Sequence, residues 1–165
     1  MNIGIIPARL DSKRFPKKIL KLLNGKPMIV STVERSLKAK RLDKVILAID
    51  SQETKNALQG FDFEITMTSK EHTSGTDRAA EVIAKIKEAK IVINIQGDEP
   101  MIDPKIIDAL VEKIENPLVE FATVISKNLD AADILNPNVV KAFINEKKEI
   151  IDFKRHILDS QIGGA

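Results

Sequence analysis

Short apolar runs alternate along this chain with segments whose apolar residues recur at helical spacing. The apolar runs cover residues 3–7, 44–49, 63–67, 91–95 and 121–125, and they are typical of strands buried in a parallel sheet. The helical pattern covers residues 28–39, 52–58, 76–89 and 104–116. Strands that alternate with helices in this way predict an α/β fold.

The pattern changes near the C-terminus. Residues 139–144 and 149–153 are β-like runs on either side of the sequence NEKK, so we expect a hairpin with a four-residue loop, although this loop lacks glycine. The length of 165 residues suits one domain, and no repeat or Pro/Gly/Ser-rich linker divides the chain before its last three residues. We therefore expect a single domain over residues 1–165.

Composition narrows the classes of function. Lys and Arg total 26 against 24 Asp and Glu, and a net charge of +2 argues against a nucleic-acid partner. With no cysteine, the chain has neither a disulfide framework nor a thiolate metal site. No window approaches the roughly 20 apolar residues of a membrane span, and the first apolar run is too short for a signal peptide. We expect a cytoplasmic protein that does not bind membranes.

A basic loop follows the first apolar run directly. In α/β sheets ligands bind beyond the carboxyl ends of the strands, and Arg and Lys there can meet several phosphates at once. The loop has no glycine between Gly4 and Gly25, so it is neither a Walker loop nor a dinucleotide fingerprint. It predicts a nucleoside triphosphate site held mainly by side chains, while a solvated basic loop and a nucleic-acid patch remain alternatives. Its cations are Arg9, Lys13, Arg14, Lys17 and Lys18.

The sequence QGDEP follows the fourth apolar run, residues 91–95. A carboxylate at the end of a buried strand is well placed to hold Mg²⁺, which prefers oxygen ligands and is often shared with substrate phosphates. Asp98 is the expected ligand, and Glu99 either supports the metal through water or points elsewhere. The alternative is that Gly97 and its neighbours form only a turn.

The sequence HTSGTDR leads into the third predicted helix. Its Ser and Thr hydroxyls can cap the helix, with Ser74 or Thr76 as N-cap, or they can hydrogen-bond the edge of a base. Arg78 can stack on such a base or pair with it. His72 and His156 each stand alone in the sequence, so we expect surface or hydrogen-bonded residues rather than a general base or a metal ligand.

Several motifs together, in this order, resemble the 3-deoxy-manno-octulosonate cytidylyltransferase family over about residues 2–155. The related acylneuraminate cytidylyltransferases share the Pro-Ala-Arg loop in a looser form and remain an alternative. The resemblance implies a three-layer sandwich with a mainly parallel Rossmann-like sheet, of the nucleotide-diphospho-sugar transferase type. The motifs are IPARLDSKRFPKK, LNGKPMI, HTSGTDR, NIQGDEPMI and NPNVVK.

The resemblance also implies a reaction. The anomeric hydroxyl of a 2-keto sugar acid (Kdo) attacks the α-phosphorus of CTP, which gives a CMP-sugar for lipopolysaccharide precursor synthesis and releases pyrophosphate. Arg9 and Lys18 would hold the triphosphate and stabilise the leaving pyrophosphate, and Asp98 would carry the cofactor Mg²⁺.

The remaining site residues follow from the same resemblance. Arg14 would assist at the triphosphate, and Arg155 would face the carboxylate of the sugar acid. The cytosine side would be lined by Ser74, Arg78 and Gln96, with backbone atoms of Pro7 and Ala8 approaching the base.

The chain also departs from the family. Asp77 stands where Glu is commoner, and Lys154 stands where Ser is usual. The family's C-terminal third, with a sugar-acid segment, dimer contacts and a second metal carboxylate, has no counterpart after Arg155. We expect that another chain supplies the second metal ligand, that Asp103 or Asp159 substitutes for it, or that the site has no second carboxylate. The chain is then a homodimer, half of a split enzyme with a complementing chain, or a catalytically incomplete CTP-binding module.

Overall fold

A computed structural model describes residues 1–11, 15–128 and 130–157 of the chain. The contacts between residues divide the chain into two compact units, residues 1–122 and residues 123–165. The expectation of a single domain over residues 1–165 therefore stays a prediction. Among the described residues, no helix is both long and apolar enough to cross a membrane.

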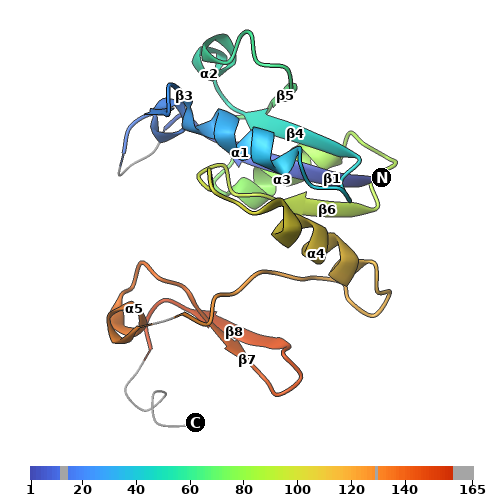
Figure 1. The fold of residues 1–165 in the computed structure, drawn as a ribbon, viewed down its shortest axis with the longest axis vertical. Helices are drawn as coiled ribbons and strands as arrows, with labels where there is room; N and C mark the ends of the chain where they lie inside the picture. The colour runs from blue at the N-terminus through green and yellow to red at the C-terminus, as the bar shows by residue number, and fades with distance from the viewer. Residues whose placement is uncertain (12–14, 129, 158–165) are drawn as a thin grey trace. The chain divides into compact units, whose positions relative to one another are not determined.

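The first unit is built on a four-stranded sheet in the order β5-β4-β1-β6, in which every pair is parallel (Figure 1). The register aligns the ends of neighbouring strands, since Ala8 pairs with Ile49 and Ile49 with Met67. The strands confirm four of the predicted apolar runs within a few residues. They are β1 (Asn2–Ala8), β4 (Lys44–Ile49), β5 (Glu64–Met67) and β6 (Ile91–Asn94).

The four predicted helices of this unit are present. The third is shorter than the pattern predicts, because after Ile83 the hydrogen bonds from Ile86 to Ile83 and from Ala89 to Ile86 span only three residues. These helices are α1 (Met28–Ser36), α2 (Gln52–Ala57), α3 (Gly75–Ile83) and α4 (Pro104–Ile114). Three short elements lie between β1 and α1 without having been predicted: η1 (Lys18–Leu20), β2 (Leu22–Leu23) and β3 (Lys26–Pro27).

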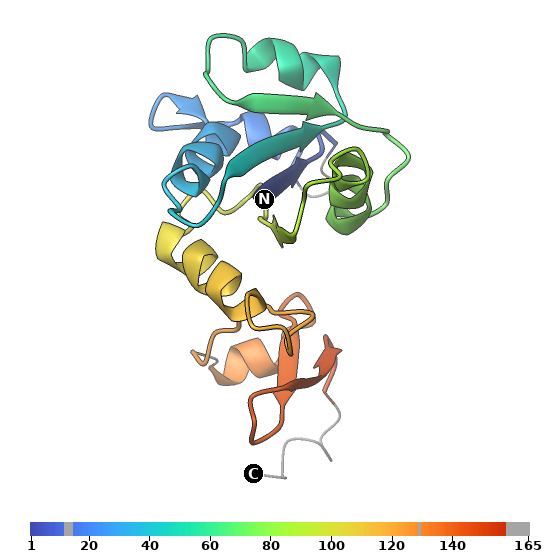
Figure 2. The same ribbon diagram turned by 90° about the vertical axis from the view of Figure 1, so that its right-hand side faces the viewer.

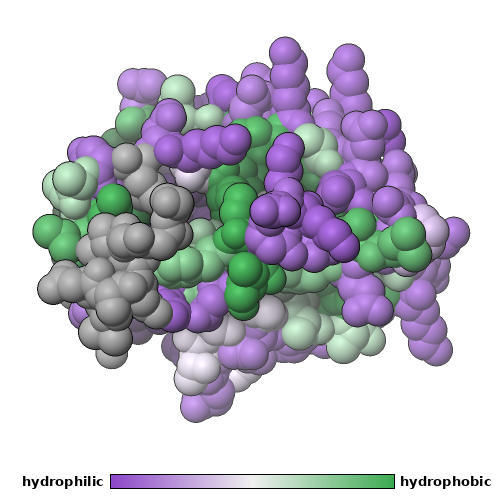
Figure 3. Space-filling view, turned by 90° about the horizontal axis from the view of Figure 1, so that it is seen from below, coloured by the Kyte–Doolittle hydropathy of each residue, from purple (hydrophilic) through white to green (hydrophobic). Residues whose placement is uncertain are grey.

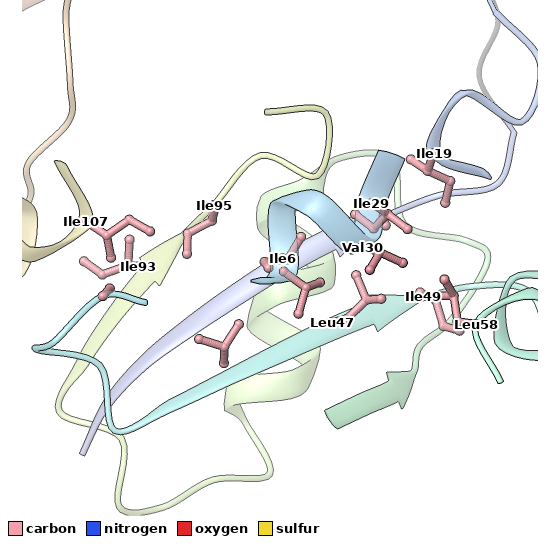
Figure 4. Close-up of a cluster of buried hydrophobic side chains, with 14 of the residues drawn as sticks. Ile6, Ile19, Ile29, Val30, Leu47, Ile49, Leu58, Ile93, Ile95 and Ile107 are labelled. Carbon is pink, nitrogen blue, oxygen red and sulfur yellow. The ribbon is translucent and has the colours of Figure 1, made fainter. Parts of the chain in front are cut away.

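Helices cover both faces of the sheet, which confirms the predicted three-layer sandwich. Figure 2 shows α3 on one side of the sheet and α1 and α4 on the other. The face towards α1 and α4 holds the larger cluster of buried side chains, in which Ile6, Leu47 and Ile93 of the strands pack with Ile29 and Ile107 of the helices (Figure 4). The opposite face of β1 and β4 packs against Ala79 and Val82 of α3.

The second unit contains a helix and a hairpin: α5 (Ala131–Leu135), β7 (Lys141–Ile144) and β8 (Ile150–Lys154). The strands are antiparallel, as predicted, with a register shift between Phe143 and Ile144. Their connection is residues 145–149, one residue longer than predicted, and Lys148 takes the positive φ of 62° there in place of a glycine. No pattern predicted α5.

The strand predicted over residues 121–125 is wrong, because this segment lies outside every strand. A buried strand needs a neighbouring strand and a covered face, whereas Phe121 is 76% exposed and Val124 is 53% exposed. Exposed apolar side chains continue into the second unit at Leu135, Ile151 and Phe153. The space-filling view in Figure 3 shows hydrophobic patches among hydrophilic side chains.

Candidate functional site

The parallel sheet brings the segments after its strands to one edge. β1, β4, β5 and β6 all end at this edge, so the basic loop, the HTSGTDR segment and the QGDEP segment meet there. They enclose an open cleft of about 890 Å³. The cleft is lined by Pro7, Ala8, Arg9, Phe15, Lys18, Ile19, His72, Thr73, Ser74, Gly75, Arg78, Gln96, Gly97 and Asp98.

One side of the cleft is basic. Arg9 follows β1 directly, and Lys18 begins the short helix η1. Next to it, Ile19 is 6% exposed and anchors η1 in the core, so the Lys18 side chain stays at the surface of the cleft. Arg14, which was predicted to assist here, lies outside the described residues.

Lys18 and Asp98 form an ion pair in the lining of the cleft, with Lys18 Nζ 2.8 Å from Asp98 Oδ2. They are 80 residues apart in the sequence. The ion pair brings the predicted pyrophosphate-stabilising cation next to the predicted metal ligand. Its side chains are 39% and 50% exposed, so both are accessible to a ligand.

The Asp98 segment is a tight turn packed against β1. The Glu99 amide donates to the Gln96 carbonyl at 3.2 Å, so the predicted turn is confirmed, while the metal-binding role of Asp98 stays a prediction. A Cβ atom on Gly97 would lie 2.9 Å from the Pro7 carbonyl oxygen, which is closer than real Cβ contacts. Thr32 of α1 donates to the Gly97 carbonyl at 3.2 Å. Glycine therefore lets the turn approach the end of β1.

The donor set at Asp98 suits a magnesium ion shared with phosphates. Mg²⁺ is usually bound through one or two carboxylates, with waters and substrate phosphates completing its shell. Asp98 supplies one accessible carboxylate, and among the described residues no three His, Cys, Asp or Glu side chains cluster as metal ligands. Asp103 caps α4 by accepting from the Lys105 amide at 3.0 Å, and Asp159 lies outside the described residues.

Ser74 is the N-cap of α3, which confirms the predicted capping role. Its hydroxyl accepts from the Asp77 amide at 3.1 Å and donates to the Asp77 carboxylate at 2.7 Å. The second bond is the largest of the effects that lower the pKa of Asp77. The start of this helix packs against β1, since a Cβ on Gly75 would lie 3.0 Å from Pro7 Cγ. Ser74 thus lines the cleft from a fixed position.

Arg78 is held inside the wall of the cleft. Its side chain is 3% exposed, and Nη2 donates to Asp50 Oδ2 at 2.9 Å. Nη1 donates to Thr68 Oγ1 and to the Ser69 carbonyl. The structure thus gives Arg78 three protein partners, where the sequence suggested only a base.

His72 is a hydrogen-bonded residue, as predicted. Its partner is Glu81 of α3, with 2.6 Å between Nε2 and Oε2. Glu81 also accepts from the Ser69 amide at 2.9 Å and from Lys85 at 3.0 Å. The Ser69 amide, followed by His72 and Lys85, lowers the pKa of Glu81 from 4.5 to about 2. Glu81 therefore fastens the loop before α3 to the helix.

Arg155 and His156 belong to the second unit. The Arg155 guanidinium donates to the carbonyls of Pro137 and Asn138 at 3.3 and 3.4 Å. The buried ammonium of Lys141 donates to the Arg155 carbonyl at 2.8 Å. Arg155 is thus tied to the NPNVVK segment, and His156 is exposed.

Sequence reasoning missed three residues of the site. Phe15 and Ile19 line the cleft beside Lys18, and the ammonium of Lys21 lies 5.5 Å from the centre of the Phe15 ring. Asp50 forms the buried ion pair with Arg78. Its position directly after the second apolar run was the available signal, because the rule that selected Asp98 applies equally to that strand.

A parallel sheet with cations and a carboxylate after its strands is typical of α/β proteins that bind nucleotides. Residues 3–161 match the sequence profile of the cytidylyltransferases, and the chain belongs to this family.

Curated relatives agree with this assignment. The chain is 43% identical over 157 residues to the 3-deoxy-manno-octulosonate cytidylyltransferase of Geobacter sulfurreducens, covering 94% of this chain and 62% of the relative. It is 44% identical over 154 residues to the enzyme of that name from Alteromonas mediterranea, covering 92% and 61%. The chain therefore spans about three fifths of the length of these relatives, and the predicted resemblance is confirmed.

A solved structure gives the same result. A CMP:2-keto-3-deoxy-manno-octonic acid synthetase complexed with CTP superposes with a TM-score of 0.84 at 38% identity. The match covers 94% of this chain and 65% of that chain. It confirms the predicted fold.

Proposed function

We propose that the chain carries the CTP-binding part of a cytidylyltransferase that transfers CMP to the anomeric hydroxyl of a 2-keto sugar acid, with release of pyrophosphate. The observation that carries the proposal is the pairing of Lys18 with Asp98 in a cleft also lined by Arg9, at the carboxyl edge of a parallel sheet. A cation and a carboxylate so placed suit a triphosphate and the metal ion that accompanies it.

The chemistry is a displacement at the α-phosphorus. The anomeric hydroxyl gives up its proton to solvent, and its oxygen bonds to this phosphorus as the bond to the pyrophosphate oxygen breaks. Arg9 and Lys18 bind the β- and γ-phosphates and stabilise the charge that grows on the leaving pyrophosphate. Asp98 holds Mg²⁺, which, when bound, neutralises phosphate charge and orients the triphosphate. Arg14 assists at the triphosphate in this proposal.

The cytosine is proposed to bind to other lining residues of the same cleft. Gln96 offers an amide that both donates and accepts, which suits the edge of a cytosine base. Backbone atoms of Pro7 and Ala8 approach the base, and Ser74 and Arg78 complete this part of the lining. Because Arg78 is buried and paired, we propose that it acts on the base side chiefly by shaping the wall.

The second substrate is proposed to be Kdo, which is 3-deoxy-manno-octulosonate, because the curated relatives are named as cytidylyltransferases of this sugar acid. Arg155 would bind the sugar carboxylate as a bidentate pair. The product would serve lipopolysaccharide precursor synthesis in the cytoplasm, where CTP is available. A second copy of the chain, or a different chain, is proposed as its partner.

Pyrophosphate release from purified protein tests the reaction. We expect release that requires CTP, Mg²⁺ and Kdo together, with little release when ATP replaces CTP. N-acetylneuraminate in place of Kdo tests the acylneuraminate alternative, and faster release with it would overturn the proposed sugar acid. If no combination of substrates gives pyrophosphate, the proposal that this chain catalyses the transfer by itself is wrong.

A CTP-binding module without turnover is the second candidate. It is favoured by the absence of a second carboxylate, beside Asp98, among the described residues that line the cleft, because a second metal ligand was expected for the complete site. Calorimetry separates the two, because a module binds CTP and Mg²⁺ with measurable heat while the pyrophosphate assay stays blank.

A further inference from the structure

Asp50 connects the basic loop to the base side of the cleft. It follows β4 directly, and its side chain is 12% exposed. Oδ1 accepts from the Leu10 amide at 3.1 Å, and Oδ2 accepts from Arg78 Nη2 at 2.9 Å. One carboxylate therefore joins a loop after β1 to a residue of α3.

The Arg78 end of this connection is fixed on several sides. The guanidinium donates to Thr68 Oγ1 and to the Ser69 carbonyl as well as to Asp50. Thr68 in turn donates to the carbonyl of Ile49 at 2.8 Å. The network thus returns to the strand end that carries Asp50, so the carboxylate has little freedom to turn.

The Leu10 end restrains Arg9. In the sheet, Ala8 pairs with Ile49, and this is the last pair of β1 with β4. Arg9 lies between that pair and the Leu10 amide held by Asp50. Its backbone is therefore held on both sides, and Arg9 lines the cleft together with Lys18.

We propose that Asp50 is a positioning residue for nucleotide binding, which fixes the Arg9 segment so that the guanidinium meets the triphosphate. Asp50 lines a smaller pocket with Arg9 and Leu10 rather than the main cleft, so it is placed to act on the nucleotide through Arg9. The proposal rests on the CTP-binding function proposed above.

Asp50→Asn tests the proposal, with Thr68→Val as its matched control. Asparagine has one acceptor oxygen, and the buried Arg78 guanidinium takes it, because an unpaired buried charge costs more than an unpaired amide. The Leu10 amide then loses its acceptor. Thr68→Val removes a partner of Arg78 at nearly constant volume and leaves the Leu10 bond in place.

Two measurements follow. Hydrogen exchange of the Leu10 amide, read by NMR in the unliganded protein, should be about tenfold faster in Asp50→Asn than in the wild type. The dissociation constant for CTP should rise about tenfold and that for CMP clearly less, because Arg9 serves the outer phosphates. Thr68→Val should unfold at a lower temperature with wild-type Leu10 exchange and a wild-type ratio of CTP to CMP affinity.

Unchanged Leu10 exchange in a folded Asp50→Asn protein would overturn the proposal, and so would an unchanged CTP to CMP ratio. If Asp50→Asn does not fold, hydrogen exchange of the Leu10 amide in the wild-type protein is the test. Exchange at the rate of an unprotected amide would overturn the proposal, and slower exchange would support it. A wild-type protein that binds no CTP would overturn the proposed function. Even if no CTP binds, faster exchange of the Leu10 amide in Asp50→Asn would show that Asp50 holds this amide.

Discussion

At the scale of single residues, two charges define the cleft. Lys18 and Asp98 pair at 2.8 Å although each is accessible, and such exposed pairs stabilise a fold by only about 0–1 kcal/mol. Their value to the fold is small, so ligand binding can separate them at little cost. The proposed triphosphate and its metal ion would make use of both charges.

Lys18→Ala should lower turnover more than it weakens CTP binding, because the Lys18 charge is needed most when negative charge builds on the leaving pyrophosphate. We expect a loss of kcat of about 100-fold with a CTP dissociation constant raised less than about tenfold. Lys17→Ala is the control, since it removes the same charge from a residue paired with Glu53 outside the cleft. Equal kinetics for Lys18→Ala and wild type would remove Lys18 from the mechanism.

Asp98→Asn should abolish the Mg²⁺ dependence of CTP binding, since it removes the charge at nearly constant volume. Calorimetry with and without Mg²⁺ measures this, and thermal unfolding checks that the variant is folded. Glu99→Gln is the neighbouring control, because Glu99 does not line the cleft, and its Mg²⁺ response should match the wild type. A wild-type metal response in Asp98→Asn would point to another ligand.

At the scale of elements, the hydrophobic pattern predicted the strands of the parallel sheet correctly but failed for the residues at the sequence boundary of the two units. Residues 44–49 form β4 with the predicted bounds, because a fully buried strand shows a continuous apolar run. Residues 121–125 have a similar run and yet form no strand, because sequence pattern does not reveal whether a neighbouring strand exists. The short helix α5 was missed since its five residues are too few for a helical period.

The same limit applies to the site. The order of motifs predicted Arg9, Lys18, Ser74, Gln96 and Asp98 in one place, because parallel strands align their carboxyl ends. The position of Asp50 after a buried strand was a signal for the site, but its pairing with Arg78 could not be predicted, since it depends on side-chain packing between β4, the loop after β5 and α3.

The loop before α3 should respond to acid through Glu81. Its pKa is lowered from 4.5 to about 2, so the ionised group stabilises the fold above about pH 4.5, and this contribution is lost as the pH falls through 2. Glu81→Gln should therefore unfold at a lower temperature than the wild type at pH 6, with a difference that shrinks towards pH 2. Thermal unfolding across this range measures it.

Glu71→Gln is the control for this pH dependence, because it changes an exposed carboxylate of the same loop. Its unfolding temperature should follow the wild-type curve. A difference between Glu81→Gln and wild type that stays constant with pH would contradict the assigned cause of the lowered pKa.

The turn after β6 should tolerate no side chain at Gly97. Gly97→Ala places a Cβ 2.9 Å from the Pro7 carbonyl oxygen, so we expect a loss of about 1–3 kcal/mol in the free energy of unfolding and weaker CTP binding. Gly60→Ala is the control, since its φ of 92° strains an alanine while its Cβ meets open space. It should lose stability without losing CTP affinity, and equal CTP affinity in both variants would argue against close packing at Gly97.

At the scale of the whole molecule, the first unit holds the complete cleft, whereas the residue assigned to the sugar acid belongs to the second unit. We therefore expect CTP binding to depend on the first unit, and transfer to a sugar acid to depend on Arg155 of the second unit as well. This separation explains why binding is a more direct test of the account than turnover.

Calorimetric titration of the purified chain with CTP and Mg²⁺ is that test. We expect one CTP bound per chain, weaker binding when Mg²⁺ is removed by a chelator, and weaker binding of ATP than of CTP. A folded wild-type protein that shows no binding of CTP in the presence of Mg²⁺ would contradict this expectation.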